Sequence, residues 1–377
     1  MSRRRPVDGT TSWTGDRVGG WAPYGTRDDR AGATAPGGAG PGGAGPDRPT
    51  AEAPRNRPGR RRGEQLMVPE ADFRSYYDRA IIKPPVWKVP DVPTYLYLGG
   101  VAGVSAVMAA LADASGRPLL RRVGRLAAAF GATVSVGALV HDLGRPTRFL
   151  NMLRVFKPTS PLSVGSWILA PFGTLAGATA ASELTGVAPG LARLTGAGAG
   201  VLGPALTTYT AVLLADTAVP AWHEAYRELP FVFAGSALAS GGAVGMLAGG
   251  EAGPARRIAV TGAVIELGAT AALERRVGPV ARAYRTGRAG TVLRMARAAT
   301  LAGTIGTVLA GRLRRRQRLV SLVSAALLNA GSAATRYGIF EGGMASARDP
   351  EYTVVPQRQR LTDAQGAATT RDDPAPR

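Results

Sequence analysis

The sequence predicts an all-α integral membrane protein with about eight spanning helices, flanked by two tails that lack a fold. Large apolar side chains are concentrated between about residues 93 and 335 and are almost absent from residues 1–66, although the whole chain is 45% hydrophobic. They form blocks of roughly 17 to 24 residues, the length that a helix needs to cross a bilayer. Short connections that carry arginine separate the blocks. Soluble domains rarely show this spacing.

The N-terminal region divides into two parts. Residues 1–66 are rich in Arg, Gly and Pro, which predicts a disordered tail that rests on anionic lipid. No apolar segment follows the start MSRRRP, so we expect no cleaved signal peptide. Residues 67–92 combine aromatic residues, such as Trp87, with several prolines, and predict an ordered interfacial lead-in to the first helix.

The spans follow from the lengths of the apolar blocks, and a disordered tail is expected at residues 344–377. The predicted spans cover residues 93–112, 122–141, 163–184, 196–219, 229–249, 257–273, 295–311 and 318–336.

Eight spans would put both termini on one side of the membrane. The connections on the terminal side and those on the opposite side carry twelve Arg and Lys residues each. The flanking Arg74, Arg79, Lys83, Lys88 and Arg336 shift the balance toward cytoplasmic termini in a multi-pass protein of the cell membrane.

Composition argues against several function classes. The net charge is +20, but the arginines lie at the ends of apolar blocks, where they reach lipid headgroups, so nucleic acid is not an expected partner. The chain has no cysteine, which excludes disulfides and cysteine-ligated iron–sulfur clusters within it. Its two histidines, His141 and His223, are unsuited to an axial haem pair, and His223 is expected to be structural or interfacial. No resident haem, cluster or metal is therefore expected.

The connection between the second and third predicted spans is the most informative part of the chain. It reads HDLGRPTRFLNMLRVFKPTSPLSVGSW over residues 141–167 and mixes basic with apolar side chains. Such a segment can dock an acidic protein face or lie on lipid, and a plain surface helix is the alternative. The docking candidates are Arg148, Asn151, Arg154 and Lys157.

The run HDLGRPTRFLNMLRVFKPTSPLSVGSWIL, residues 141–169, resembles the signature of the NrfD/polysulfide reductase membrane-subunit family, and PTYLYLGGVAG, residues 93–103, resembles its first helix. The resemblance covers about residues 67–343. It implies two four-helix bundles, a quinone-reactive one at 93–219 and a second at 220–343. It also implies electron exchange between the quinone pool and a ferredoxin-like iron–sulfur subunit, with a molybdopterin oxidoreductase as the catalytic subunit. Menaquinone is expected because the arginine bias indicates a GC-rich bacterial gene.

The resemblance implies a quinone pocket in the first bundle, on the terminal side, near Asp91. A quinone needs hydrogen-bond donors and a proton-exchanging group. The proton-exchanging candidates are His141, Asp142 and Tyr209. The expected quinone contacts are Trp87, Lys88, Tyr95 and Arg145. His141 and Asp142 could instead cap the helix end or pair with Arg145. The sequence also departs from the family, which often has His or Asn where Lys88 and Thr94 enter the first helix.

Carboxylates within apolar spans are costly and are therefore candidate functional groups. Asp216 follows Tyr209 on the fourth predicted span and could continue a proton route, or could be a helix-end residue near water. Glu266 lies near the middle of the sixth predicted span and needs a partner, water or a proton. Both are proton-route candidates.

The sequence is best interpreted as a quinone-reactive membrane anchor that works as a non-autonomous subunit of an oxidoreductase complex. One alternative is a secondary transporter, which would show broken helices and internal repeats. Another is a non-catalytic anchor, in which changes at Tyr209 or His141 would have no effect.

Overall fold

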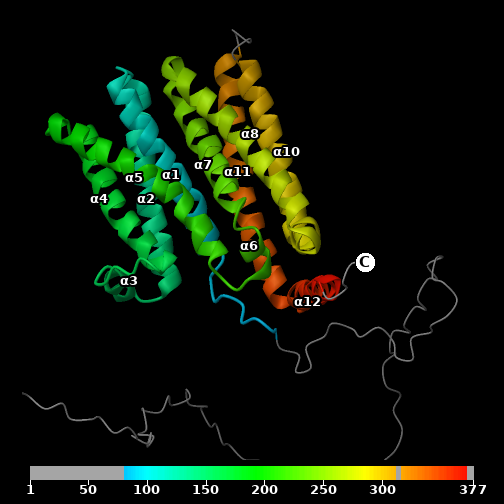
Figure 1. Cartoon of the computed structure of the whole chain (residues 1–377). Helices are drawn as coiled ribbons and strands as arrows, with labels where there is room; N and C mark the ends of the chain where they lie inside the picture. Colours follow the sequence, from blue (N-terminus) through cyan, green and yellow to red (C-terminus); the bar gives the residue numbers. More distant parts are fainter. Residues whose placement is uncertain (1–79, 311–315, 372–377) are drawn as a thin grey trace, which may run out of the picture. The chain divides into compact units, whose positions relative to one another are not determined.

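The computed structural model describes residues 80–310 and 316–371, with side chains as far as residue 361. The predicted tail at 1–66 and the first part of the lead-in lie outside these residues. Within the described ranges the chain is helical and has no strand, which confirms the all-α prediction there (Figure 1).

In the described part, a long helix lies at each of the eight predicted spans, shorter helices connect them, and one further helix of 21 residues follows the last span. The first four are α1 (Asp91–Ala114), α2 (Pro118–Leu143), α4 (Pro161–Thr185) and α5 (Pro189–Ala215). The next are α7 (Leu229–Gly245), continued by the 3-10 helix η1 (Met246–Glu251), then α8 (Gly253–Arg276), α10 (Gly287–Ala310) and α11 (Gln317–Arg348). The connecting elements are α3 (Pro146–Met152), α6 (Pro220–Glu224), η2 (Gly278–Ala281) and α9 (Arg282–Arg285), and the helix after the last span is α12 (Glu351–Arg371).

Proline and glycine set several helix ends. Pro118, Pro161 and Pro189 begin α2, α4 and α5, where a missing N–H group costs nothing because the first turn has no intrahelical acceptor. Gly144 and Gly186 end α2 and α4 in the left-handed conformation, with φ of 71° and 74°, which glycine adopts without strain. The sequence therefore encodes the boundaries of the helices that carry the site.

Five helices of the described part are long and apolar enough to cross a membrane: α1, α2, α4, α5 and the α7–η1 unit. This supports a multi-pass membrane protein. The remaining long helices, α8, α10 and α11, do not reach the same apolarity; α8, for example, carries Glu266 and begins and ends with arginine pairs. Eight spans are thus not established by length and composition.

The long helices pack mainly against their neighbours in the chain. Helix α1 contacts α2 and α5, and α4 contacts α2 and α5. Helix α7 contacts α8 and α11, and α10 contacts α11. The two groups meet where α7 lies against α1 and α5, as Figure 1 shows.

Glycines permit the closest approaches between these helices. A Cβ atom on Gly103 would lie 2.6 Å from the carbonyl oxygen of Gly203, so the backbones of α1 and α5 touch directly. A Cβ on Gly242 would lie 2.5 Å from the backbone nitrogen of Ala259, which shows the same contact between α7 and α8. Larger side chains would separate these pairs.

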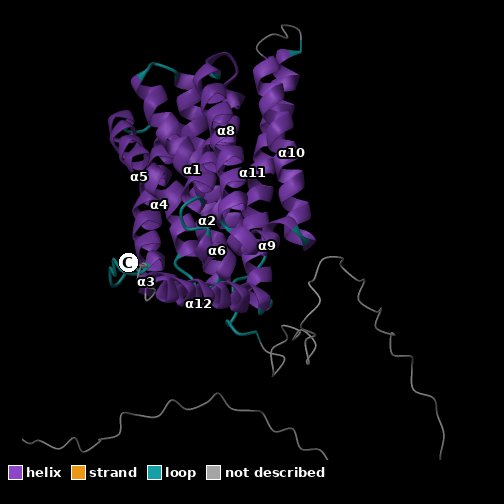
Figure 2. Ribbon diagram, turned by 45° about the vertical axis from the view of Figure 1, so that its right-hand side comes forward, coloured by secondary structure: helices purple, strands orange, loops and turns teal. Residues whose placement is uncertain are grey.

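Helices α3, α6, α9 and α12 lie at the end of the helices where α1 begins, which we call the terminal face (Figure 2). Helix α12 is attached there by ion pairs of Glu351 with Arg282 and of Arg360 with Glu224, and Tyr352 is buried. The prediction of a disordered tail from residue 344 is therefore wrong for residues 344–361. The polar composition of residues 344–361 gave no indication that ion pairs and a buried tyrosine attach this segment to the other helices.

Two arginines assigned to membrane flanks are buried among helices. Arg336 has no exposed surface and lies inside α11, twelve residues before its end, because α11 extends well past the predicted boundary. Arg125 is 7% exposed within α2 and pairs with Asp113 and Glu183. Counting either as a surface charge was wrong, which weakens the prediction of orientation.

Candidate functional site

The start of α1 and the end of α2 meet in a polar cluster on the terminal face. His141 Nδ1 donates to Asp91 Oδ2 at 2.7 Å. Asp142 Oδ1 accepts from the backbone N–H of Lys88 at 2.9 Å, and Lys88 Nζ donates to the carbonyl oxygen of His141 at 3.1 Å. Four residues predicted near a quinone pocket are thus brought together. His141 pairs with Asp91 rather than with Arg145.

Two tyrosines lie below this cluster. Tyr95, on α1, is buried and lies near Tyr209 on α5 and Asp142 on α2. Tyr209 packs on Gly165 of α4, where an added Cβ would come within 2.2 Å of its ring. Glycine at position 165 therefore provides the space for the Tyr209 ring.

An open cavity of about 670 Å³ lies beside Tyr209 on the terminal face. Its polar residues are Tyr209, Asp216, His223 and Tyr226. Its apolar wall comes from the start of α4 and the end of α5, and the full lining is Pro158, Thr159, Pro161, Val164, Tyr209, Val212, Ala215, Asp216, His223, Tyr226 and Pro230. A mostly apolar cavity with a few convergent polar groups is typical of small-molecule sites.

The histidine of this cavity has a defined orientation. His223 Nδ1 is 3.2 Å from the carbonyl oxygen of Ala215, and because a carbonyl only accepts, Nδ1 carries the proton of that bond. Nε2 is then free to accept a proton. Sequence reasoning expected His223 to be structural, since nothing in AWHEAYRE indicates that the end of α5 and the α6 segment share a cavity.

Arg276 holds the outer wall of the cavity in place from α8. It ion-pairs with Glu228, donates to the carbonyl oxygen of Glu224, and its guanidinium lies 5.6 Å from the centre of the Tyr226 ring. The hydrogen bond to Glu228 raises the pKa of Arg276 above its ordinary value, so the arginine stays charged. These residues are far apart in sequence, and no pattern indicated their contact.

Asp216 and Trp87 lie differently from their expected positions. Asp216 follows the last residue of α5 and is exposed, so it is a helix-end residue and not a carboxylate inside a span. Trp87 stacks on Trp222 and Phe340, with ring centroids 5.4 and 6.4 Å away, and attaches the lead-in to α6 and α11. Arg145 is exposed and precedes α3. Of the seven residues predicted for the quinone site, Tyr209 lines the cavity, and the other six do not: Trp87, Lys88, Tyr95, His141, Asp142 and Arg145.

The docking candidates lie on one exposed segment. Arg148, Asn151, Arg154 and Lys157 are all exposed on and after α3. Leu150, Val155 and Phe156 are 63%, 71% and 54% exposed on the same segment. The segment therefore presents both basic and apolar groups on the terminal face.

The predicted proton-route residue Glu266 lies in the second group of helices. It is 2% exposed; Oε1 accepts from Thr335 at 2.5 Å, and Oε2 is buried with no hydrogen-bond partner. Its charge interacts with that of Arg336. Its burial agrees with the expectation that it needs a partner or a proton, but it does not line the cavity beside Tyr209.

Comparison with known families gives the identity of this region. No curated protein matches the chain significantly. Residues 80–253 match the family described as "Polysulphide reductase, NrfD". That range contains α1 to η1, the polar cluster and the whole cavity lining. Residues 80–253 thus match the polysulphide reductase NrfD family, in agreement with the resemblance noted in the sequence.

Proposed function

We propose that the chain is the quinone-reactive membrane subunit of an oxidoreductase complex, and that the cavity beside Tyr209 takes the quinone headgroup. One observation carries this proposal: a cavity with a phenol, an imidazole and a carboxylate lies wholly within the part that matches the NrfD family. The family supports a membrane subunit of a quinone-linked oxidoreductase in general. Menaquinone is the proposed species.

The residues of the cavity suit two-electron, two-proton exchange. In the direction of quinol oxidation, the Tyr209 hydroxyl donates to one quinone oxygen and fixes the ring. Nε2 of His223 accepts one quinol proton, since Nδ1 is held by Ala215. The exposed carboxylate of Asp216 takes the second proton and passes it to water. The two electrons leave to an iron–sulfur cluster of a partner subunit. Quinone reduction uses the same groups in reverse.

The polar cluster at the start of α1 and the end of α2 suits the same proton exchange. His141 is exposed and paired with Asp91, which suits it to exchange protons between water and the buried tyrosines. Asp142 and Lys88 hold the α2 end against the lead-in and so position His141.

We propose that the segment around α3 docks the iron–sulfur subunit. Its exposed Arg148, Arg154 and Lys157 suit an acidic, ferredoxin-like surface, and Phe156 supplies apolar area beside them. A molybdopterin oxidoreductase would complete the complex on that subunit. Charge reversal at Arg154 should release the partner at lower salt than in the wild type.

We further propose that α8, α10 and α11 also cross the membrane, which gives eight spans in two four-helix bundles with both termini in the cytoplasm. Their length of 24 to 32 residues and their packing against α7 and one another support this. The chain has no cysteine, so single cysteines at Gly250 and Thr286 can be labelled without background. Eight spans require labelling from opposite sides, and labelling from one side would refute this.

Glu266 is proposed as a proton acceptor within the second bundle. Its unpaired Oε2 supports a role beyond packing. In proteoliposomes of the complex, Glu266→Gln should keep quinol oxidation and lose proton uptake. Unchanged proton uptake would leave Glu266 with a structural role only.

The test of the proposed function is purification of the tagged chain from its membranes, followed by protein identification and quinol-dependent reduction of the iron–sulfur clusters. Tyr209→Phe and His223→Gln should each slow that reduction at least tenfold. Tyr97→Phe is the matched control, because Tyr97 donates to Asn329 and does not line the cavity. A partnerless protein without quinol activity would favour a transporter. A complex that is indifferent to both substitutions would favour a non-catalytic anchor.

A further inference from the structure

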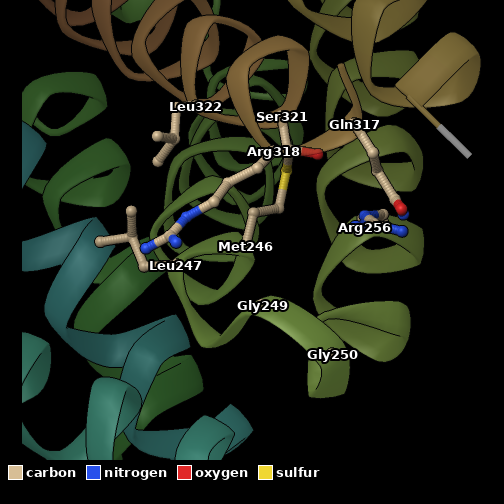
Figure 3. Close-up of a pocket in the computed structure, with 9 residues that line it drawn as sticks. All are labelled: Met246, Leu247, Gly249, Gly250, Arg256, Gln317, Arg318, Ser321 and Leu322. Atoms are coloured by element: carbon tan, nitrogen blue, oxygen red, sulfur yellow. The ribbon is translucent and has the colours of Figure 1, made fainter. Parts of the chain in front are cut away.

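A second cavity lies at the opposite end of the helices from the terminal face. It measures about 310 Å³ and is formed where η1 leads into α8 and where α11 begins. Figure 3 shows its lining, which is Met246, Leu247, Gly249, Gly250, Arg256, Gln317, Arg318, Ser321 and Leu322. None of the proposed quinone-site residues contributes to it, so it needs an explanation of its own.

The charge of this cavity is unbalanced. Arg256 and Arg318 both line it, no Asp or Glu does, and neither arginine ion-pairs with a carboxylate of the described residues. The buried Arg125, by contrast, ion-pairs with Asp113 and Glu183. Two unneutralised guanidiniums in one cavity favour an anionic ligand.

Polar groups of the cavity are also left without partners. The carboxamide oxygen of Gln317, turned toward Arg256, accepts from both terminal nitrogens of that guanidinium at 3.2 Å. Arg256 Nε and the Ser321 hydroxyl are buried and have no hydrogen-bond partner. Burying such groups unpaired destabilises the fold, and a ligand that accepts from both would remove this cost.

The shape of the backbone helps an anion to approach. Gly249 turns the chain with a φ of +60°, and a Cβ atom added to Gly249 or Gly250 would meet no atom within 4 Å, so the cavity floor is open. The first turn of the 24-residue α8 begins three residues later, at Gly253, and its free N–H groups favour negative charge. In Figure 3, Arg318 reaches across from α11 toward Leu247, and Arg256 lies beside Gln317.

The surroundings distinguish a lipid from a dissolved ion. Leu247 and Leu322 line the cavity and are 56% and 43% exposed, and Leu319, the neighbour of Arg318, is 64% exposed. A free phosphate ion makes no favourable contact with an apolar border, whereas a phospholipid packs its acyl chains against one. Basic cavities between helix ends at a membrane surface suit phosphate headgroups.

We infer that this cavity binds the phosphate headgroup of an anionic phospholipid, with Arg256, Arg318 and Ser321 as its ligands and the exposed leucines against its acyl chains. The site would fasten the η1 turn and the start of α11 to the lipid surface. It is independent of the quinone chemistry on the terminal face.

The test uses the purified full-length chain in nanodiscs of phosphatidylcholine with and without phosphatidylglycerol. Native mass spectrometry after detergent transfer should show one phosphatidylglycerol retained per wild-type chain. Arg318→Gln should weaken retention about fivefold, and Arg256→Gln with Arg318→Gln roughly thirtyfold. Arg122→Gln is the matched control, since Arg122 is exposed at the start of α2 and does not line the cavity; it should retain the lipid.

Three outcomes decide the matter. Loss of retention in the cavity variants, with the control unchanged, supports the site. Equal retention by all variants overturns it. If millimolar inorganic phosphate displaces the phosphatidylglycerol, and the length of the acyl chains makes no difference, the cavity is a free-anion site and the lipid assignment is overturned. Arg318→Glu separates loss of binding from misfolding. Because Arg318 is exposed, reversing its charge should abolish lipid retention while the elution volume of the chain stays unchanged.

Discussion

Replacing Arg336 tests how the two groups of helices are held together. Its guanidinium donates to the carbonyl oxygens of Leu96 at 3.1 Å and Phe233 at 2.6 Å and to Ser236 Oγ at 3.3 Å. It also lies 3.9 Å from the centre of the Phe233 ring and interacts with the charge of Glu266. Arg336 thus links α11 to α1 and α7. Arg336→Met removes these bonds and also the positive charge that acts on Glu266.

The expected loss of unfolding free energy is about 3–5 kcal/mol, the cost of removing one partner from a buried charge pair. Adding Glu266→Gln to Arg336→Met should restore at least about 1 kcal/mol, because the uncompensated charge is then removed. Unfolding in mixed micelles with increasing SDS, followed by tryptophan fluorescence, measures both. Arg122→Met, at an exposed site, should change stability by less than about 0.5 kcal/mol.

Two results would refute this reasoning. Stability of Arg336→Met within about 0.5 kcal/mol of the wild type would mean that the buried guanidinium contributes nothing net. Strict additivity of the Arg336 and Glu266 substitutions would mean that the two charges are not coupled.

Further predictions concern close contacts. Gly165→Ala should push the Tyr209 ring out of place and lower quinol-dependent activity at least tenfold with little loss of stability, whereas Gly173→Ala, whose Cβ meets no atom within 4 Å, should be neutral in the same assay. Full activity of Gly165→Ala would show that the position of Tyr209 is unimportant. Gly103→Ala should separate α1 from α5 at Gly203 and cost about 1–3 kcal/mol in SDS unfolding, and an unchanged midpoint would count against direct backbone contact.

Much of the fold could be predicted because the lengths of the apolar blocks, and the prolines and glycines at helix ends, are local signals. Each predicted span coincides with a long helix of the described part, and the prolines that begin α2, α4 and α5 lie where the sequence suggested connections. The end of α11 was misplaced, since Arg336 was taken for a membrane boundary. A buried arginine is recognised only from the carbonyl groups that surround it, and these come from other helices.

The site was less predictable than the fold. The motif at residues 141–169 supplies His141 and Asp142, which form one hydrogen-bonded cluster with Asp91 and Lys88. The cavity itself depends on the α5 end meeting the loop around His223, a contact with no sequence signal. Cavities form where elements distant in sequence fail to fill space, so composition and spacing carry little information about them.

The central claim is that the cavity beside Tyr209 binds a quinone. Equilibrium titration of the purified chain with a fluorescent hydroxyquinoline N-oxide, a quinol analogue, tests it most directly. We predict one saturable site per chain and binding about five- to tenfold weaker in Tyr209→Phe, the loss expected for one hydrogen bond. Binding that does not saturate, or that is equally tight in Tyr209→Phe and His223→Gln, would contradict the account.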